Sequence, residues 1–291
     1  MEHLLNTFIE HYKRMPLWNP SIIKNSEKYD ANILRNIFNC IDLTSLNTED
    51  NRDKIEKFCN KVKEFNSHFS DMPNVAAVCV YPVFADIINR NLAETDVKKA
   101  VVSACFPSSQ TFLDIKIEET KKAISMGANE IDIVISVGEF LSHNYKFVAE
   151  EIRALKNVAG NAILKVILET GLLCSPENIW NASIIAMDSG ADFIKTSTGK
   201  TNISATPEAA WIMTNAIKAF YLQTGKKVGF KPAGGIVTVE DAMIYRSIVK
   251  ETLGDSHLNN RLFRIGTSRL ANNVLTEIES LKGANKIVSY F

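Results

Sequence analysis

The chain has 291 residues, of which 46% are hydrophobic, enough to bury the core of one barrel domain or of two smaller domains. Its 33 basic and 33 acidic residues give no net charge, which argues against nucleic acid or an anionic membrane as the main partner. We therefore expect a small-molecule partner.

Five cysteines are spread along the chain without a C-x-x-C pair. Their odd number and spacing indicate neither a disulfide framework nor a zinc site, so we expect a reducing, cytoplasmic location. No basic start is followed by an apolar run, and no apolar span reaches the ~18 residues that a membrane helix needs. The sequence predicts a soluble, unprocessed protein that has no membrane partner.

Residues 1–39 carry apolar residues at roughly helical spacing on both sides of a break at Pro16 to Pro20. We expect an N-terminal helical extension that either caps one end of the main core or extends a contact between subunits.

In residues 40–283, short apolar runs that predict strands alternate with helical stretches. One such helix is Pro207–Gln223, which has Thr206 as its N-cap and Gly225 as its stop. Eight strands at nearly even spacing most economically close as a parallel (β/α)8 TIM barrel. A doubly wound open sheet is the alternative, but no G-x-G-x-x-G follows the first strand. The predicted strands are Cys40–Leu43, Val75–Val80, Ala100–Cys105, Glu130–Ile135, Ile163–Leu168, Phe193–Lys195, Val228–Lys231 and Phe263–Ile265.

The final segment, residues 284–291, follows a helix stop at Gly283 and has too little apolar content to fold alone. We expect a mobile C-terminal tail.

Two neighbouring strands end in lysine, at Lys195 and Lys231. If both ammonium groups point into one mouth of the barrel, burial and mutual repulsion lower the pKa of at least one of them. An uncharged lysine in such a pocket is a good nucleophile for carbonyl carbon. Either lysine alone could instead extend its ammonium group to solvent or pair with a carboxylate.

Asp132 and Lys165 occupy matching places on the fourth and fifth strands, and we expect them to pair. Because the desolvation of an ion pair inside a barrel can exceed its attraction, the pair favours a role in proton transfer. A structural salt bridge is the alternative.

Glycines and hydroxyl residues follow strands six, seven and eight. Glycine lets backbone amides approach an anion closely, and the loops after strands seven and eight of such barrels are a frequent phosphate site. The sequence therefore predicts a phosphorylated substrate. The candidate residues are Thr198, Gly199, Lys200, Gly234, Gly235, Gly266, Thr267 and Ser268.

These motifs together resemble the deoxyribose-phosphate aldolases, class I enzymes that cleave 2-deoxyribose 5-phosphate to acetaldehyde and glyceraldehyde 3-phosphate. Only the first 40 or so residues and the tail lie outside the resemblance. The matching stretches are DLTSL at Asp42–Leu46, VCVYP at Val78–Pro82, GANEIDIVI at Gly127–Ile135, LKVILETG at Leu164–Gly171, DFIKTSTGK at Asp192–Lys200, GFKPAGGI at Gly229–Ile236 and FRIGTS at Phe263–Ser268.

The resemblance implies that Lys195 forms the Schiff base, that Lys231 lowers its pKa, and that Asp132 with Lys165 and a water relays protons. The same resemblance implies a role in deoxyribonucleotide catabolism, with no metal or cofactor because the lysine itself withdraws the electrons. The implied partners are a phosphorylated sugar and acetaldehyde, with a homo-oligomer also possible.

Asp42 and Cys79 line the same mouth in the family; for Cys79 we prefer a packed thiol to a catalytic one. The chain departs from the family at Arg269, which either adds a phosphate contact or points outward. It also departs at the tail, where Tyr290 matches a terminal tyrosine that helps enamine protonation but is followed by Phe291.

Two other functions are open. A catalytically idle barrel could bind a sugar phosphate, although a decayed enzyme would be expected to lose one of the four catalytic candidates. A class I aldolase for another phosphorylated sugar would keep the lysine chemistry and change the acceptor pocket.

Overall fold

The barrel strands are short segments buried on both faces, as strands of a parallel sheet covered by helices must be. The computed structural model describes residues 1–21, 28–284 and 286–291. Its strands are β1 Ile41–Thr44, β2 Ala77–Val80, β3 Lys98–Val102, β4 Glu130–Val134, β5 Ile163–Ile167, β6 Phe193–Lys195, β7 Gly229–Lys231 and β8 Ile265–Thr267.

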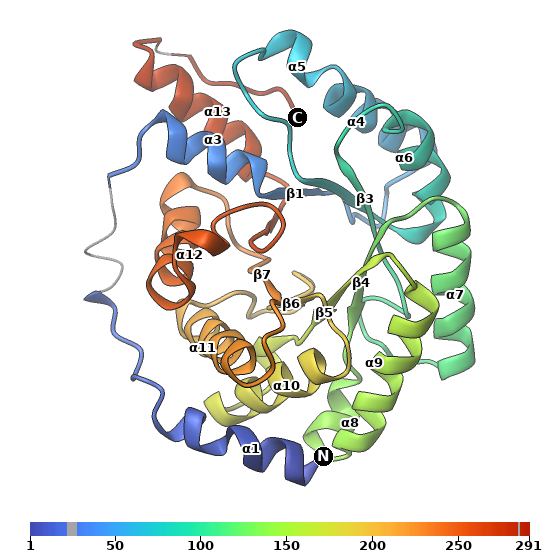
Figure 1. Cartoon of the computed structure of the whole chain (residues 1–291). Coiled ribbons are helices and arrows are strands. Elements are labelled where there is room, and N and C mark those ends of the chain that lie inside the picture. Colours follow the sequence, from blue (N-terminus) through green and yellow to red (C-terminus); the bar gives the residue numbers. More distant parts are fainter. Residues whose placement is uncertain (22–27, 285) are drawn as a thin grey trace.

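All neighbouring strands pair in parallel, in the order β7-β6-β5-β4-β3-β2-β1-β8 (Figure 1). Parallel bridges from Phe230 to Phe263 and from Ala233 to Gly266 join β7 to β8 and close the ring. The predicted (β/α)8 barrel is therefore confirmed, and the open sheet is excluded.

Helices surround the ring on its outer side (Figure 1). Thr206 caps one of them by accepting a hydrogen bond from the Ala209 amide, and Gly225 ends the same helix with φ of 72°, as predicted. The helices are α1 Glu2–Lys13, α3 Ala31–Asn39, α4 Arg52–Lys63, α5 Phe65–His68, α6 Ala85–Asn91, α7 Leu113–Ser125, α8 Val137–Leu141, α9 Tyr145–Ala159, α10 Pro176–Asp188, α11 Pro207–Thr224, α12 Val239–Leu253 and α13 Leu270–Leu281; the 3-10 turns are η1 Pro82–Phe84, η2 Thr170–Leu172 and η3 Asp255–His257.

Two predicted strands are displaced. β3 ends at Val102 because Ala104 and Cys105 have positive φ, which stops the extended chain. β8 begins at Ile265, two residues later than predicted, so Gly266 lies within the strand instead of after it.

The N-terminal extension packs on the outer side of the helix ring. Phe8 of α1 is buried and stacks on Phe220 of α11, and Tyr12 lies against Trp180 of α10. α3 packs beside α13 instead, so the extension does not form one separate unit. Residues 22–27 of the extension lie outside the described residues.

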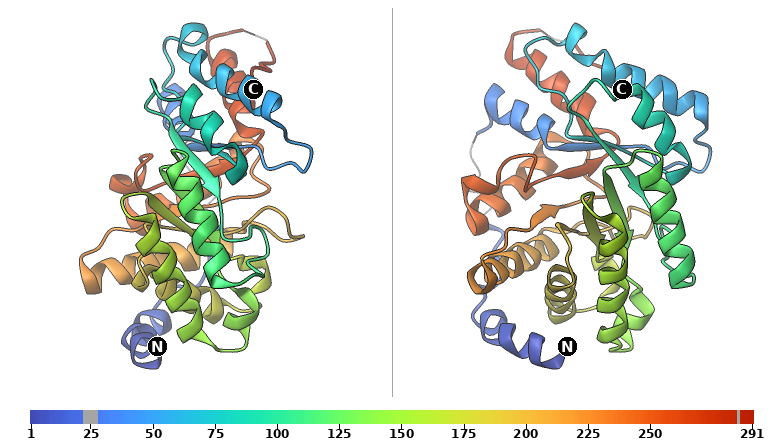
Figure 2. Two further views of the ribbon diagram at one scale, coloured as in Figure 1. Left: turned by 90° about the vertical axis from the view of Figure 1, so that its right-hand side faces the viewer. Right: turned by 45° about the vertical axis from the view of Figure 1, so that its right-hand side comes forward.

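The tail is docked where the sequence predicts mobility. The Asn272 side chain on α13 accepts hydrogen bonds from the Tyr290 and Phe291 amides, at 2.9 and 3.0 Å. The Phe291 ring stacks on Phe65 of α5, which supplies the apolar contact that the tail lacks by itself. The two termini lie at opposite sides of the barrel (Figures 1 and 2). Residue 285 lies outside the described residues.

Across the described ranges, no helix is both long enough and apolar enough to cross a membrane.

Candidate active site

Strand register brings the four predicted catalytic residues together. Asp132 of β4 is the register partner of Lys165 on β5, and Lys195 of β6 is the register partner of Lys231 on β7. All four side chains are buried, with Lys195 the most exposed at 3%.

Asp132 is the common partner of the three lysines. Its Oδ2 lies 2.9 Å from Lys195 Nζ and 2.8 Å from Lys231 Nζ, and its Oδ1 lies 3.0 Å from Lys165 Nζ. Because two ammonium groups share one carboxylate oxygen, Lys195 and Lys231 are close enough to repel each other strongly.

Asp42, Glu130 and Arg264 form a second layer around this centre. Asp42 Oδ2 lies 2.6 Å from Lys231 Nζ and 3.1 Å from Lys165 Nζ. Glu130 Oε2 lies 2.6 Å from Lys165 Nζ. Arg264 closes the layer, since its guanidinium contacts Asp42 at 2.5 Å and Glu130 at 2.9 Å.

The sequence analysis missed Arg264. It enters the barrel from the residue just before β8, and its partners lie 222 and 134 positions away along the chain. The one available signal was charge balance, because a neutral Lys195 leaves only two ammonium groups for the three buried carboxylates.

The buried cluster contains four basic and three acidic side chains. Burial lowers the pKa of Lys195, and the Lys231 charge lowers it further, against the opposing pull of Asp132. Burial opposes the charge on Lys231 as well, but the carboxylates of Asp132 and Asp42 more than offset it and raise the pKa of Lys231. Lys195 is therefore the amine of the cluster that most readily loses its proton.

The remaining lysine and the central carboxylate stay charged. Despite burial, Asp132, Asp42 and Glu130 raise the pKa of Lys165 well above its ordinary value. Despite burial, the three lysines hold the pKa of Asp132 well below its ordinary value. Asp132 and Lys165 therefore keep a pair of opposite charges beside Lys195.

Cys79 is a packed thiol, as the sequence analysis preferred. It is fully buried in a small cluster with Leu46, Ala77, Ala100 and Val102. Burial raises the pKa of its thiol to about 11, so it stays neutral at physiological pH.

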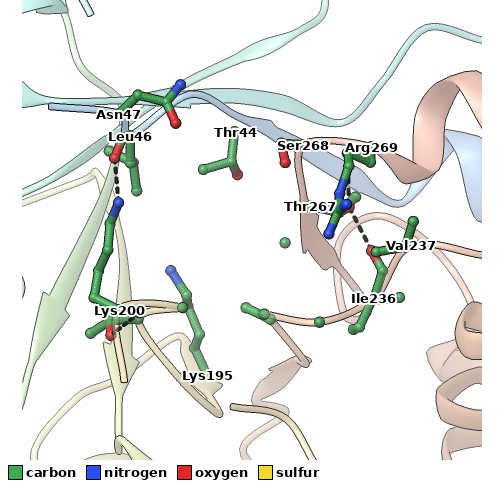
Figure 3. A pocket seen from close by; sticks show the side chains of 16 residues that line it. Thr44, Leu46, Asn47, Lys195, Lys200, Ile236, Val237, Thr267, Ser268 and Arg269 are labelled. Carbon is green, nitrogen blue, oxygen red and sulfur yellow. Dashed lines mark hydrogen bonds between the residues drawn. The ribbon is translucent and has the colours of Figure 1, made fainter. Parts of the chain in front are cut away.

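A cavity of about 250 Å³ lies above the charge cluster. Lys195 reaches into it between Lys200 on one side and Arg269 on the other (Figure 3). Asp42, Cys79, Asp132, Lys165 and Lys231 lie beneath it and do not line it. The remaining lining residues are Thr44, Leu46, Asn47, Thr198, Gly199, Ala233, Gly234, Gly235, Ile236, Val237, Gly266, Thr267 and Ser268.

At two of the predicted glycine positions, neighbouring atoms lie too close to leave room for a side chain. A Cβ on Gly234, whose φ is +85°, would lie 2.6 Å from Ser204 Cβ. A Cβ on Gly266 would lie 2.8 Å from Ala233 Cβ and 3.1 Å from Lys231 Cε, so this glycine leaves room for the buried lysine.

The N-terminus of α13 lies at the cavity wall and differs from those of the three helices before it. Helices α10, α11 and α12 each have a hydroxyl N-cap residue and a first-turn acid. The N-cap residue of α13 makes no side-chain capping bond and its first turn has no acid, although the Thr267 hydroxyl accepts from the Arg269 and Leu270 amides at 3.3 Å. Its N-cap residue is Arg269, an exposed residue on the cavity wall. The amides of this helix and the Arg269 guanidinium together favour negative charge.

Tyr290 lies away from the cavity. Its hydroxyl donates a 2.7 Å hydrogen bond to the Lys61 carbonyl, and its ring packs against Phe65 and Phe69. The structure therefore does not bring the tail candidate to Lys195.

The described part of the chain contains no group of three or more His, Cys, Asp or Glu residues suited to a metal ion.

Comparisons with known proteins identify the family and the fold. A family model described as DeoC/LacD family aldolase matches residues 37–262. The deoxyribose-phosphate aldolase of Bos taurus is 41% identical over 263 residues, which cover 87% of this chain and 82% of that protein.

Two solved structures share the fold at lower identity. A crystal structure from Coccidioides immitis has a TM-score of 0.75 and 24% identity, and the match covers 97% of this chain and 98% of that one. The tetrameric deoxyribose phosphate aldolase of Aeropyrum pernix has a TM-score of 0.66 and 22% identity, with 88% and 99% covered.

The charge network makes a prediction about Arg264. We expect Arg264→Met to lower the free energy of unfolding by about 3–5 kcal/mol, because it removes the buried cation that Asp42 and Glu130 share. The loss should be largest above pH ~4 and shrink in acid, since Arg264 helps hold the pKa of Asp42 low and that stability is lost as pH falls. Urea unfolding at several pH values measures it.

The matched control is Arg153→Met, which breaks a 2.8 Å ion pair with Asp188 whose side chains are 46% and 34% exposed. It should cost less than about 1 kcal/mol. Equal losses in the two variants would contradict a stabilising role for the buried network.

Proposed function

Because the chain belongs to the DeoC/LacD aldolase family, we propose that it is a class I deoxyribose-phosphate aldolase, a lyase that reversibly cleaves 2-deoxy-D-ribose 5-phosphate to acetaldehyde and D-glyceraldehyde 3-phosphate. One observation carries the proposal: Lys195 is the cluster residue that lines the cavity, and its pKa is lowered. That combination suits Schiff-base formation with an aldehyde.

In the cleavage direction, the neutral amine of Lys195 attacks C1 of the open-chain sugar, and loss of water gives an iminium. The 3-hydroxyl then loses its proton, the C2–C3 bond breaks, and its electron pair moves toward the iminium nitrogen. Glyceraldehyde 3-phosphate leaves. The remaining enamine is protonated at C2, and hydrolysis releases acetaldehyde and the free lysine.

We assign the proton steps to Asp132, Lys165 and a water. Asp132 lies 2.9 Å from the reacting amine and 3.0 Å from Lys165 Nζ, so it connects the iminium nitrogen to a charged donor. Lys231 acts on Lys195 through its charge, as the direction of the Lys195 pKa indicates.

We assign the phosphate to the cavity wall that the loops after β6, β7 and β8 form. Lys200 and Arg269 supply positive charge there, and the backbone at Gly234, Gly235 and Ser268 supplies close approach near the α13 N-terminus. Thr198, Gly199 and Gly266 complete this wall. The assignment gives Arg269 a phosphate contact, one of the two roles open from the sequence.

A class I aldolase for another phosphorylated sugar is the alternative. Comparing cleavage of deoxyribose 5-phosphate with cleavage of fructose 1,6-bisphosphate separates the two activities, and no activity on either would favour an idle barrel.

The cellular setting follows from the same proposal. We place the protein in deoxyribonucleotide catabolism in the cytoplasm, which the free state of all five cysteines supports. The tetrameric relative from Aeropyrum pernix supports a homo-oligomer.

Reductive trapping tests the nucleophile. Borohydride with acetaldehyde should leave an ethyl adduct on Lys195 alone, because the other two lysines stay protonated beneath the cavity. Peptide mass mapping identifies the site, and Lys195→Arg should show no adduct. An adduct on Lys231 or Lys165 would overturn the assignment.

Lys231→Leu tests the pKa mechanism. It removes a like charge and leaves the Asp132 carboxylate a stronger partner for Lys195, and both changes raise the pKa of Lys195. The acidic limb of kcat/KM should move to higher pH, and activity at neutral pH should fall by about ten- to a hundredfold. Stability should fall too, because Lys231 is fully buried with two carboxylates.

Lys227→Leu, at an exposed position just before β7, is the control for this variant and should leave the pH profile in place. A Lys231→Leu enzyme that stays folded with an unchanged acidic limb would show that Lys231 does not tune the nucleophile.

Ser268→Asp tests the phosphate wall. The added negative charge should raise KM for deoxyribose 5-phosphate by about tenfold or more and leave unphosphorylated deoxyribose nearly unaffected. Ser280→Asp, at an exposed position near the other end of the same helix, should change neither. Equal losses on both substrates would place the phosphate elsewhere.

A further inference from the structure

Glu169 is a buried acid for which the described residues provide no ion pair. Its side chain is buried, and its backbone is left-handed, with φ of 53° and ψ of 56°, a conformation uncommon for any residue but glycine. Its carboxylate accepts only from neutral donors: the Thr198 amide at 3.2 Å, the Thr198 hydroxyl at 2.5 Å and the Thr201 hydroxyl at 3.3 Å. A buried acid in a strained turn just beyond a strand end calls for a functional explanation.

Those donors all belong to the loop that follows Lys195. Thr198 Oγ1 also accepts a 3.0 Å hydrogen bond from the Lys200 amide, so one chain of bonds runs from Glu169 through Thr198 to Lys200. Lys200 Nζ donates at 2.5 Å to the Leu46 carbonyl across the cavity. The carboxylate therefore bonds to the loop whose residues Thr198, Gly199 and Lys200 line the cavity, and Figure 3 labels Lys200 there.

The turn that contains Glu169 packs directly against this loop. The Thr170 amide donates to the Thr196 carbonyl at 2.9 Å. A Cβ on Gly171 would lie 2.3 Å from the Ile203 carbonyl oxygen, so only glycine allows this contact. The turn thus holds the loop at both of its ends, and Glu169 holds its middle.

We propose that Glu169 is a positioning residue for the phosphate end of the substrate. It fixes Thr198 to Thr201 so that the Gly199 backbone and Lys200 face the cavity, and it does not touch the substrate itself. A carboxylate suits this role because it accepts from an amide and two hydroxyls at once, which a neutral amide oxygen does less well. The inference rests on the proposed function and names a residue that the sequence analysis passed over.

One consequence concerns Thr198. The Glu169 carboxylate only accepts hydrogen bonds, so the Thr198 hydroxyl donates its single hydrogen to it. The same hydroxyl oxygen accepts a hydrogen bond from the Lys200 amide. The Thr198 hydroxyl therefore has no proton left for a phosphate oxygen, and Thr198 serves the site by shaping its loop.

The test compares Glu169→Ala and Glu169→Gln with the wild type. In Glu169→Ala, KM for deoxyribose 5-phosphate should rise about tenfold or more, while kcat/KM for unphosphorylated deoxyribose stays within about threefold. Reductive trapping with acetaldehyde should proceed at the wild-type rate, because acetaldehyde carries no phosphate. Glu169→Gln should recover part of the loss, since its amide oxygen can still accept from the Thr198 amide.

Inorganic phosphate gives a readout that does not need turnover. The phosphate concentration that half-saturates the rise in Tm should increase by about tenfold in Glu169→Ala. Asp192→Asn is the matched control. Asp192 lies just before β6, at the end of that strand opposite to Lys195 and its loop. Its side chain accepts hydrogen bonds from the Leu164 amide at 2.7 Å and from Lys156 Nζ at 2.6 Å. It should lower Tm without changing the preference for the phosphorylated substrate.

Equal losses on both deoxyribose substrates in Glu169→Ala, with unchanged phosphate binding, would overturn the positioning role. If Glu169→Ala does not fold, Thr198→Val breaks the same hydroxyl link and must show the same selective rise in KM. Failure of the wild-type enzyme to trap acetaldehyde would instead count against the proposed aldolase, while the phosphate-dependent rise in Tm would still report on the loop.

Discussion

The buried charge balance at the centre of the barrel is the constraint on which the rest of the site depends. Four basic and three acidic side chains share a region without solvent, and full ionisation would leave one excess positive charge there. A buried uncompensated charge costs several kcal/mol. Contacts decide which amine gives up its proton: Lys165 has three carboxylates within 3.1 Å, Lys231 has two, and Lys195 has one. The neutral cluster is therefore the one with Lys195 as a free amine.

The cavity wall near the same strand ends has a different electrostatic role from the buried cluster. Below Lys195 the charges are paired and buried, so they set its protonation without reaching the substrate. Above it, Lys200 and Arg269 line the cavity, and the first turn of α13 carries no acidic residue. Binding energy from a phosphate held there can position the carbonyl carbon against the amine. Lys195 belongs to the buried charge cluster and also lines the cavity.

The positions of those site residues that lie on strands were predictable from sequence, because parallel strands place their carboxyl ends at one mouth of the barrel. That rule alone grouped Asp132, Lys165, Lys195 and Lys231, and the structure confirms the grouping. Arg264 was missed because its contacts span most of the chain and its strand was placed two residues early. Glu169 was missed because its importance lies in a left-handed turn, which the letters ETG do not specify.

The tail is held away from the cavity by hydrogen bonds and ring contacts. Asn272 holds both amides at the end of the chain and donates to the Phe291 carbonyl at 3.0 Å, while Phe291 packs on Phe65. Bringing Tyr290 to the cavity would break these three hydrogen bonds, its own bond to Lys61 and a stack of aromatic rings. The proton relay that we propose, of Asp132, Lys165 and a water, therefore needs no hydroxyl from Tyr290 in this arrangement.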